Sequence, residues 1–461
     1  MQDLKINKTA RNIRDVIRYI KRFHNAIAVI YIDDEVLDSP LFSSHLHDIS
    51  LIHQAGLQVV VVPGARKRID QILGDSKINW EFRDGLRITS EDAIPQIKMA
   101  AFDVSNTVMT GLASHQITAT IGNWVRARAK GIIDGKDFGA AGEIERLQIG
   151  AIKTTLESGF VPIFPCIGWS ATGKPYNISS VSLAAKIAIE LKADKLFFMI
   201  IDSEITLHNF SVPEKIGLAD DLHIPAMNLE EVDDFIAKNE KTERESKNKR
   251  EQIKQDSSVQ KQKILSLLKT ARSACENGVA RSHIINASTD GALPCEIFSE
   301  LGSGTMIYSS NYGGIRAMTQ QDIPSVLAVM HPFVQSKILL PRTESELLEK
   351  LSDYIVYEID GGIRACGALH IYPHNQAEIA ALAVDSAFSN LGIGPKMMYF
   401  LIDRAKSLGV TKIFILTTQT ADWFEKLHFV PASVSDLPKS RRQKWNKERN
   451  SKVYVLELTT R

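Results

Sequence analysis

Short apolar runs alternate with longer segments of helical pattern between residues 26 and 207. Such alternation is typical of a mainly parallel sheet with helices on both faces. The runs that we predict to be strands of this sheet, with two later runs that close it, are Ala26–Tyr31, Leu57–Val62, Phe160–Ile163, Lys195–Ile201, Val279–Ile285 and Met306–Tyr308. Because ligands in such sheets gather at the carboxyl ends of the strands, we expect a site of this unit there.

A second folding unit is expected, since 461 residues exceed the ~100–200 that one domain usually holds. Antiparallel strands are predicted over residues 354–384, followed by a glycine turn, a helix over Gly394–Leu408 and a strand over Lys412–Thr418. The sequence therefore predicts an α/β protein with a first domain over residues 26–312 and an α+β domain over residues 315–461.

Residues 1–25 are predicted to form an amphipathic helix. Apolar side chains recur at helical spacing between Thr9 and Phe23, and basic side chains cover the opposite face. A helix of this kind can lie on a membrane surface or serve as a transit segment. Asp15 and the scarcity of serine favour a helix that docks on its own domain or on a neighbouring subunit.

Residues 239–263 form a charged insertion with hardly an apolar side chain. Such a segment cannot bury a face, so we predict a solvated loop or a frayed helical hairpin. An interaction tail is the alternative.

Composition excludes several classes of protein. The 55 Lys and Arg balance 54 Asp and Glu, so the chain has no basic field with which to hold nucleic acid. Its four cysteines are far apart and form no CxxC pair, which argues against disulfides or a zinc site and suits a reducing cytoplasm. No window approaches the ~18–20 apolar residues of a membrane span, and no apolar signal segment opens the chain. We expect a cytoplasmic protein without a metal.

A loop of small residues, Ala383–Gly394, stands between a predicted strand and a predicted helix. Backbone N–H groups at a helix amino terminus can bind a phosphate, and glycines allow close approach. The order of elements resembles the GNAT acetyltransferases, whose Gln/Arg-x-x-Gly-x-Gly/Ala loop holds the pyrophosphate of coenzyme A. This resemblance implies an acetyl-CoA site formed by Leu382, Ala383, Val384, Ser389, Asn390, Leu391, Gly392, Ile393 and Gly394. Ser389 replaces the usual Gln or Arg, so backbone amides should carry more of the binding.

A closer resemblance links both domains to one family. Ala377–Val384, Phe414–Thr420 and Arg449–Ser451 are similar to segments of the bacterial N-acetylglutamate synthases. In that family an amino-acid-kinase-like sandwich precedes the GNAT domain, as expected here. The resemblance implies that acetyl-CoA and L-glutamate react to give N-acetyl-L-glutamate, the first step of arginine biosynthesis.

The first domain lacks residues that phosphoryl transfer requires in the related kinases. Their Lys-x-Gly-Gly element corresponds to Tyr31–Asp34, whose two carboxylates would repel ATP. We place neither their second glycine pair nor their lysine within Gln262–Leu267, and Val181 stands at the position of their catalytic Asp. We therefore predict no kinase activity and no bound ATP. Other segments resemble the kinase pattern, namely Gly64–Arg66, Asp84–Thr89 and the late glycine turn Gly302–Thr305. They leave two alternatives open, structural turns or a regulatory amino-acid pocket.

Acetyl transfer needs a base for the α-ammonium group of glutamate. Glu378 is the candidate, because it opens an otherwise apolar strand and partial burial would make its carboxylate more basic. The resemblance implies that Thr417 assists the leaving thiolate, and that Arg342, Arg449 and Ser451 bind glutamate. The amine attacks the thioester directly.

Two other functions stay open at this point. The GNAT domain could acetylate another amine, or the chain could be an inactive amino-acid sensor, which Ser389 favours and Glu378 and Thr417 oppose. Relatives with an amino-terminal helix and a late glycine turn respond to arginine, which implies an effector site near Tyr19, Gly302 and Gly304, although Leu301 replaces a polar residue. The same resemblance implies a homo-oligomer, with a hexamer expected.

Overall fold

The computed structural model describes residues 16, 17, 19–21, 23–83, 86–219, 221–248, 255–298, 302–309, 313–359, 361–419 and 421–458. The chain divides into two compact units. The first comprises Met1–Val212 and Pro225–Ser309, and the second comprises Pro213–Ile224 and Ser310–Arg461. The second unit thus includes a segment from within the range expected for the first domain.

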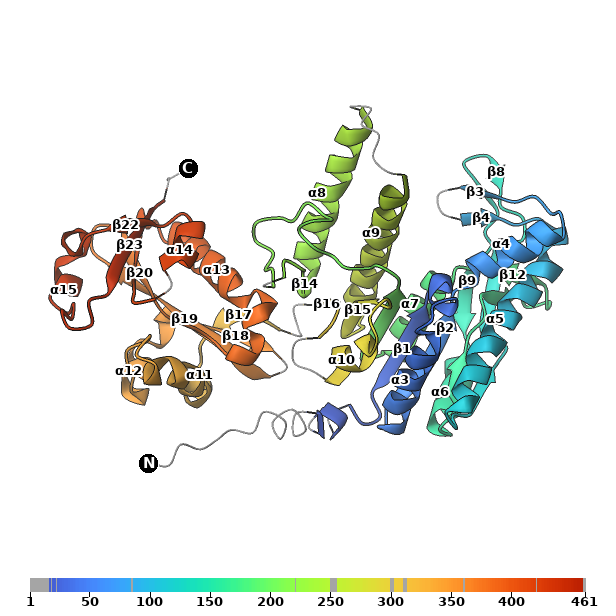
Figure 1. The fold of residues 1–461 in the computed structure, drawn as a ribbon, viewed down its shortest axis with the longest axis horizontal. Coiled ribbons are helices and arrows are strands. Elements are labelled where there is room, and N and C mark those ends of the chain that lie inside the picture. The colour runs from blue at the N-terminus through green and yellow to red at the C-terminus, as the bar shows by residue number, and fades with distance from the viewer. Residues whose placement is uncertain are drawn as a thin grey trace. The chain divides into compact units, whose positions relative to one another are not determined.

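An eight-stranded sheet forms the centre of the first unit (Figure 1). In spatial order its strands are β14 (Ala226–Asn228), β16 (Thr305–Tyr308), β15 (Arg281–Asn286), β13 (Lys195–Ile200), β1 (Ile27–Ile32), β2 (Gln58–Pro63), β10 (Val161–Ile163) and β5 (Ala119–Ile121). All neighbours are parallel except β15 and β16. The predicted mainly parallel sheet is confirmed.

Helices cover both faces of this sheet, as its two-sided burial requires. Ala28, Ile30 and Ile32 on one face of β1 share a core with α3 (Phe42–Gln54), α5 (Ile94–Ser114) and α10 (Ala292–Phe298). On the other side α7 (Ser180–Leu191) contacts β1, β2 and β13, and α9 (Gln255–Glu276) contacts β15 and β16. The other helices of more than two turns in the described part of the first unit are α4 (Arg66–Asp75), α6 (Ile149–Glu157) and α8 (Leu229–Asn248).

Smaller strands extend the first unit. A second sheet has the order β12 (Pro175–Asn177), β11 (Ile167–Trp169), β6 (Val125–Ala129) and β9 (Gly142–Leu147). Two hairpins join β3 (Glu81–Arg83) to β4 (Leu86–Ile88) and β7 (Ile132–Ile133) to β8 (Lys136–Asp137).

The described parts of the charged insertion are helical rather than looped. The end of helix α8 forms the first part of the segment and the start of α9 forms its last part, and the two helices contact each other. Asn239 is buried, so at this position the segment does bury a side chain.

Most of the predicted amino-terminal helix lies outside the described residues. Among those described, Val16 and Ile17 are exposed, whereas Phe23 is buried in the core that includes β1. The rings of Tyr19 and Phe23 are stacked with centroids 6.1 Å apart. These two aromatic residues attach the segment to its own unit.

A seven-stranded sheet forms the second unit. Its order is β17 (Gly313–Ala317), β18 (Tyr354–Ile359), β19 (Gly362–Tyr372), β20 (Gln376–Val384), β21 (Lys412–Thr417), β23 (Lys452–Glu457) and β22 (Val430–Ala432). Only β20 and β21 pair in parallel. Helix α13 (Ile393–Ser407) packs on one face and α11 (Ile323–Gln335) on the other, and the short helices are α12 (Glu344–Glu349), α14 (Ala421–Lys426) and α15 (Lys439–Arg442).

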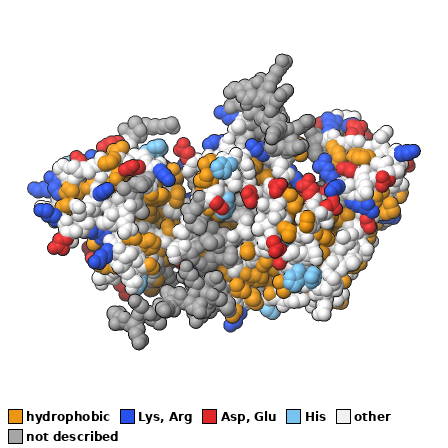
Figure 2. All heavy atoms as spheres, in the orientation of Figure 1, with side chains coloured by type: hydrophobic (Ala, Val, Ile, Leu, Met, Phe, Trp, Pro, Cys, Tyr) orange, Lys and Arg blue, Asp and Glu red, His pale blue; other side chains and the backbone are white. Residues whose placement is uncertain are grey.

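Charged side chains of both signs are scattered over the face in Figure 2. In the described part of the chain, no helix is both long and apolar enough to cross a membrane.

Candidate active site

Strands β20 and β21 separate at the point where the candidate base lies. They pair only at Gln376, Ala377 and Glu378, although β20 continues to Val384 and β21 to Thr417. The register of β19 against β20 shifts at a bulge, and nearby Ala381 has a left-handed φ of 53°. Because a bulge bends its strand, it turns the end of β20 away from β21. The main chain beyond Glu378 is thereby left open on the β21 side.

A cleft of about 80 Å³ opens beside this separation. Four predicted residues, Arg342, Glu378, Arg449 and Ser451, line it together. Thr417 does not line it, although its neighbour Leu416 does; Thr417 is buried at the end of β21. The structure therefore brings the candidate base and substrate residues into one site and leaves Thr417 at its border.

Glu378 is buried, as predicted, but its carboxylate has partners that the sequence analysis missed. Arg441 donates from Nε to Oε2 at 2.8 Å and from Nη2 to Oε1 at 3.0 Å. The hydroxyl of Tyr372 donates to Oε2 at 3.0 Å. Burial and the charge of Glu378 raise the pKa of Tyr372 well above its usual value. The hydroxyl of Tyr372 therefore keeps its proton and remains a donor.

Three arginines surround the cleft. Arg449 donates to the carbonyl of Ile338, and Arg342 donates to the carbonyl of Pro341 at 3.3 Å. Burial, and then the charges of Arg342 and Arg441, lower the pKa of Arg449. Glu378 carries the single carboxylate among the described lining residues, so the cleft has an excess of positive charge.

The predicted coenzyme A residues lie on one continuous stretch. Leu382–Val384 end β20, Ser389–Leu391 belong to a short 3-10 helix, and Gly392–Gly394 begin α13. Gly392 has a φ of 64° and lies before the helix with no side-chain cap, which leaves amino-terminal N–H groups for a ligand. The hydroxyl of Ser389 donates to the carbonyl of Ser386 at 3.0 Å.

Within the second unit, Pro213–Ile224 packs near this helix start. A Cβ on Gly392 would lie 2.3 Å from the Cα of Gly217, so only glycine allows this approach. Lys215 also pairs with Asp403 of α13 at 3.3 Å. The glycine at 392 is thus needed for a backbone contact as well as for its left-handed φ.

The segment that corresponds to the kinase Lys-x-Gly-Gly element, Tyr31–Asp34, holds a carboxylate that forms an ion pair within the first unit. Lys263, on α9, contacts Oδ1 of Asp33 at 2.7 Å, and the hydroxyl of Tyr31 donates to Oδ2 of Asp33 at 2.8 Å. The segment 262–267 therefore does contain a lysine, which the sequence analysis overlooked, and this lysine neutralises a carboxylate. Burial, and then the charge of Asp33, raise the pKa of Asp34 to about 6.

The predicted glycine turn encloses a second buried pair. Glu296 accepts from the backbone N–H groups of Ser303 at 2.5 Å and Gly304 at 2.8 Å, and lies 2.6 Å from Nδ1 of His283. Burial lowers the pKa of His283 to about 4. Although burial opposes it, hydrogen bonds from His283 and the turn lower the pKa of Glu296 to about 2. An ionised Glu296 and a neutral His283 follow.

This pair is connected to the amino-terminal aromatic residues through cations. The Lys195 ammonium lies 4.5 Å and the Arg281 guanidinium 5.8 Å from the centroid of the Phe23 ring. The charges of both cations also act on His283. Ring contacts and charge interactions thus link Tyr19 to the Gly302–Gly304 turn within the first unit.

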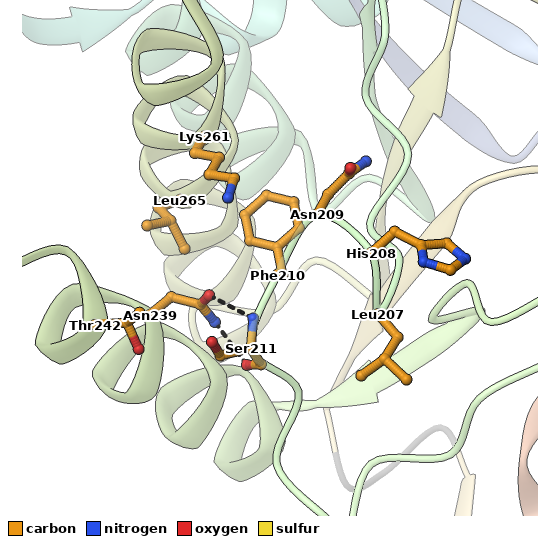
Figure 3. A pocket seen from close by; sticks show the side chains of 9 residues that line it. All are labelled: Leu207, His208, Asn209, Phe210, Ser211, Asn239, Thr242, Lys261 and Leu265. Atoms are coloured by element: carbon orange, nitrogen blue, oxygen red, sulfur yellow. Dashed lines mark hydrogen bonds between the residues drawn. The ribbon is translucent and has the colours of Figure 1, made fainter. Parts of the chain in front are cut away.

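A separate pocket of about 250 Å³ lies between α8, α9 and the loop 207–211 (Figure 3). Asn239 fixes this loop, since its side chain accepts from the N–H of Ser211 and donates to the carbonyl of Ser211, each at 2.9 Å. None of the predicted site residues lines this pocket. Among the described residues, no group of three or more His, Cys, Asp and Glu side chains could hold a metal ion.

Comparisons with known proteins agree with the division of the chain. A sequence model of the amino acid kinase family matches residues 27–286, and one of the acetyltransferase (GNAT) family matches residues 325–429. An amino-acid acetyltransferase from Actinobacillus pleuropneumoniae serotype 7 (strain AP76) is 31% identical over 451 residues, covering 95% of this chain and 96% of that protein.

Two solved structures are similar over nearly the whole chain. One is N-acetylglutamate synthase from Neisseria gonorrhoeae complexed with coenzyme A and L-arginine, with 27% identity, a TM-score of 0.70 and coverage of 98% of this chain and 100% of that one. The other is the same enzyme complexed with coenzyme A and N-acetyl-glutamate, with 27% identity, a TM-score of 0.57 and the same coverage. The resemblance found in the sequence is confirmed, and the chain belongs to the amino-acid acetyltransferases, with an amino acid kinase family domain followed by a GNAT domain.

Proposed function

We propose that this acetyltransferase moves the acetyl group of acetyl-CoA to the α-amino group of L-glutamate and releases N-acetyl-L-glutamate and coenzyme A. The observation that carries this proposal is the charge of the cleft, where three arginines face a single carboxylate, Glu378. With Arg441 engaged by Glu378, Arg342 and Arg449 can each pair with one carboxylate of a dicarboxylate substrate. The Neisseria enzyme crystallised with N-acetyl-glutamate, the product of this reaction, supports the proposal.

The open edge of β20 and the start of α13 suit acetyl-CoA. Unpaired main chain beyond Glu378 can hydrogen-bond an extended arm, and the N–H groups after Gly392 can bind phosphate. The Neisseria gonorrhoeae enzyme crystallised with coenzyme A supports acetyl-CoA as the co-substrate.

The reaction requires one proton acceptor and one proton donor. Glu378 takes a proton from the substrate ammonium, and the freed nitrogen attacks the thioester carbonyl. The C–N bond forms and the C–S bond breaks, and the leaving thiolate takes a proton from Thr417, the proposed donor. The nitrogen gives up its second proton in this step, which restores the Thr417 hydroxyl, and Glu378 releases the first proton to solvent. Ser451 lines the cleft and helps to hold glutamate.

Glutamate turnover can be tested by release of free coenzyme A thiol from acetyl-CoA with a panel of amino acids. We expect glutamate to give the highest kcat/KM, with aspartate and glutamine weaker because each misplaces or lacks one carboxylate. Preference for another amine would contradict the proposed substrate, and no release with any amine would leave an inactive sensor.

We further propose L-arginine as an effector bound by the first domain near Tyr19, Gly302 and Gly304, in a cytoplasmic homo-oligomer, expected to be a hexamer. The Neisseria enzyme crystallised with L-arginine supports the effector. The domains that we propose are the amino-terminal segment 1–25, a regulatory domain over 26–312, from which Pro213–Ile224 groups with the second unit, and the GNAT domain over 315–461.

The effector proposal predicts that arginine changes glutamate-dependent coenzyme A release, with a coupling of ~1–3 kcal/mol between the two sites. Deletion of residues 1–24 should abolish the response and leave basal turnover. An equal response in the truncated protein, or none in the full-length protein, would remove the amino-terminal segment from regulation. Sedimentation velocity of both proteins tests the hexamer.

A further inference from the structure

Arg441 belongs to a basic stretch that looks like solvated surface in the sequence, yet its side chain is only partly exposed and lines the cleft. Its side chain is 15% exposed and that of Glu378 is 6% exposed. Its neighbours Lys439 and Arg442 are exposed, and Arg442 donates to the main chain of Leu437. The arginine at 441 is therefore the member of α15 that faces the predicted base.

The contact between Arg441 and Glu378 is bidentate. Nε and Nη2 each bind one carboxylate oxygen, which fixes the plane of the carboxylate. A carboxylate has about four acceptor positions, and Tyr372 occupies one on Oε2. The hydrogen bonds of Arg441 and Tyr372 thus leave Oε1 one acceptor position for a substrate proton.

Several other charged and titratable groups lie around Glu378. His370 is its cross-strand partner on β19 and lies 2.7 Å from Asp353, while Phe414 on β21 carries no charge. Arg342, Lys444 and Arg449 line the same cleft. The hydrogen bonds and ion pairs of Glu378 within the described residues connect it to Arg441 and Tyr372.

We propose that Arg441 is a positioning residue for Glu378. Its guanidinium balances the charge of the buried carboxylate and turns Oε1 toward the cleft, so that Glu378 can accept a proton from the substrate ammonium. Burial alone would favour a protonated carboxylic acid, which cannot act as a base. The cations around the cleft also disfavour the ammonium form of the amine, which eases the same transfer. This inference rests on the proposed function.

The test compares Arg441→Gln, Arg441→Lys and the exposed control Lys439→Gln in glutamate-dependent coenzyme A release as a function of pH. In R441Q we expect the acidic limb of kcat/KM for glutamate to move upward by about 1–3 pH units, because an opposite charge is lost beside a buried carboxylate. R441K keeps the charge, so its limb should stay near that of the wild type while kcat falls, because one ammonium cannot hold both oxygens. K439Q should match the wild type.

A substrate-binding role would give a different result. If R441Q raises KM for glutamate without moving the acidic limb, Arg441 contacts substrate and the proposal is wrong. In the Glu378→Gln background, R441Q should lower kcat/KM for glutamate little further, since Arg441 acts through Glu378. Additive losses of kcat/KM would also contradict the proposal.

Folding and the proposed substrate are checked separately. If circular dichroism shows that R441Q does not fold, the pH profile of R441K tests the proposal instead. R441K keeps the positive charge, so an upward shift of the acidic limb of its kcat/KM profile would contradict the proposal. Absence of glutamate acetylation by the wild type would instead refute the proposed function.

Discussion

Replacing Asp34 by asparagine is expected to stabilise the first unit at neutral pH. Asp34 lies beside the buried Asp33, and burial followed by this neighbouring charge raises its pKa from 3.8 to about 6. Its Oδ2 accepts the backbone N–H of Lys67 at 2.6 Å, a bond that the amide oxygen of asparagine can keep. Asp34→Asn therefore removes a disfavoured charge and retains the hydrogen bond.

The size and sign of the effect follow from proton linkage. Because the folded pKa lies above the unfolded value, the folded protein binds more protons between pH 3.8 and about 6, and stability falls as pH rises through that window. At 1.36 kcal/mol per pKa unit, the free energy of unfolding of the wild type is lower by about 3 kcal/mol above this pH window. D34N should not show this loss of stability. Below about pH 4 the charge of Asp34 should no longer lower the stability of the wild type relative to D34N.

Urea unfolding at a neutral and an acidic pH measures this difference. The control is Asp75→Asn, which removes an exposed carboxylate from the end of α4 and should change stability by about 0.5 kcal/mol or less. A D34N variant that is less stable at neutral pH, or equally stabilised at both pH values, would refute the reasoning.

Three further results are expected. Glu378→Gln should lower kcat by the 10²–10⁴ typical of a lost general base, while acetyl-CoA binding, measured by calorimetry, persists; near-wild-type turnover at all pH values would reject the base. Lys263→Met should cost about 3–5 kcal/mol in urea unfolding because it strands a buried carboxylate, and Asp33→Asn in the same chain should recover most of the loss; equal stability of the single and double variants would show that the pair is unimportant. Incubation with ATP, magnesium and N-acetylglutamate should form no ADP above a heat-killed control, and measurable phosphorylation would disprove the loss of kinase chemistry.

Local patterns predicted the elements of both units, since they depend on neighbours in the chain. The predicted helix Gly394–Leu408 is α13, Ile393–Ser407, and the predicted strand Phe160–Ile163 is β10, Val161–Ile163. Phe160 is 40% exposed and lies just outside the strand. Periodicity thus identifies an element, whereas its limits depend on packing that the sequence does not display.

The partners of the site residues could not be predicted in the same way. Lys263 is 230 positions from Asp33, and Arg441 is 63 positions from Glu378. Arg441 stands in a basic run that is equally compatible with a solvated surface, and the sequence gives no sign that one member turns inward. A carboxylate within an apolar strand is the signal for Glu378, and the same signal implies a compensating cation beside it.

The ion pair at the end of β1 has an evolutionary consequence. The lysine of the related kinases corresponds to Tyr31 on β1, whereas here the lysine is Lys263 on α9, which pairs with Asp33 just after β1. Replacing Tyr31 by lysine alone would place a second ammonium group near Lys263 in a largely buried site, and removing Lys263 first would leave Asp33 uncompensated. Either order of substitution passes through a destabilised intermediate. The ion pair therefore opposes the stepwise acquisition of the kinase residues at this site.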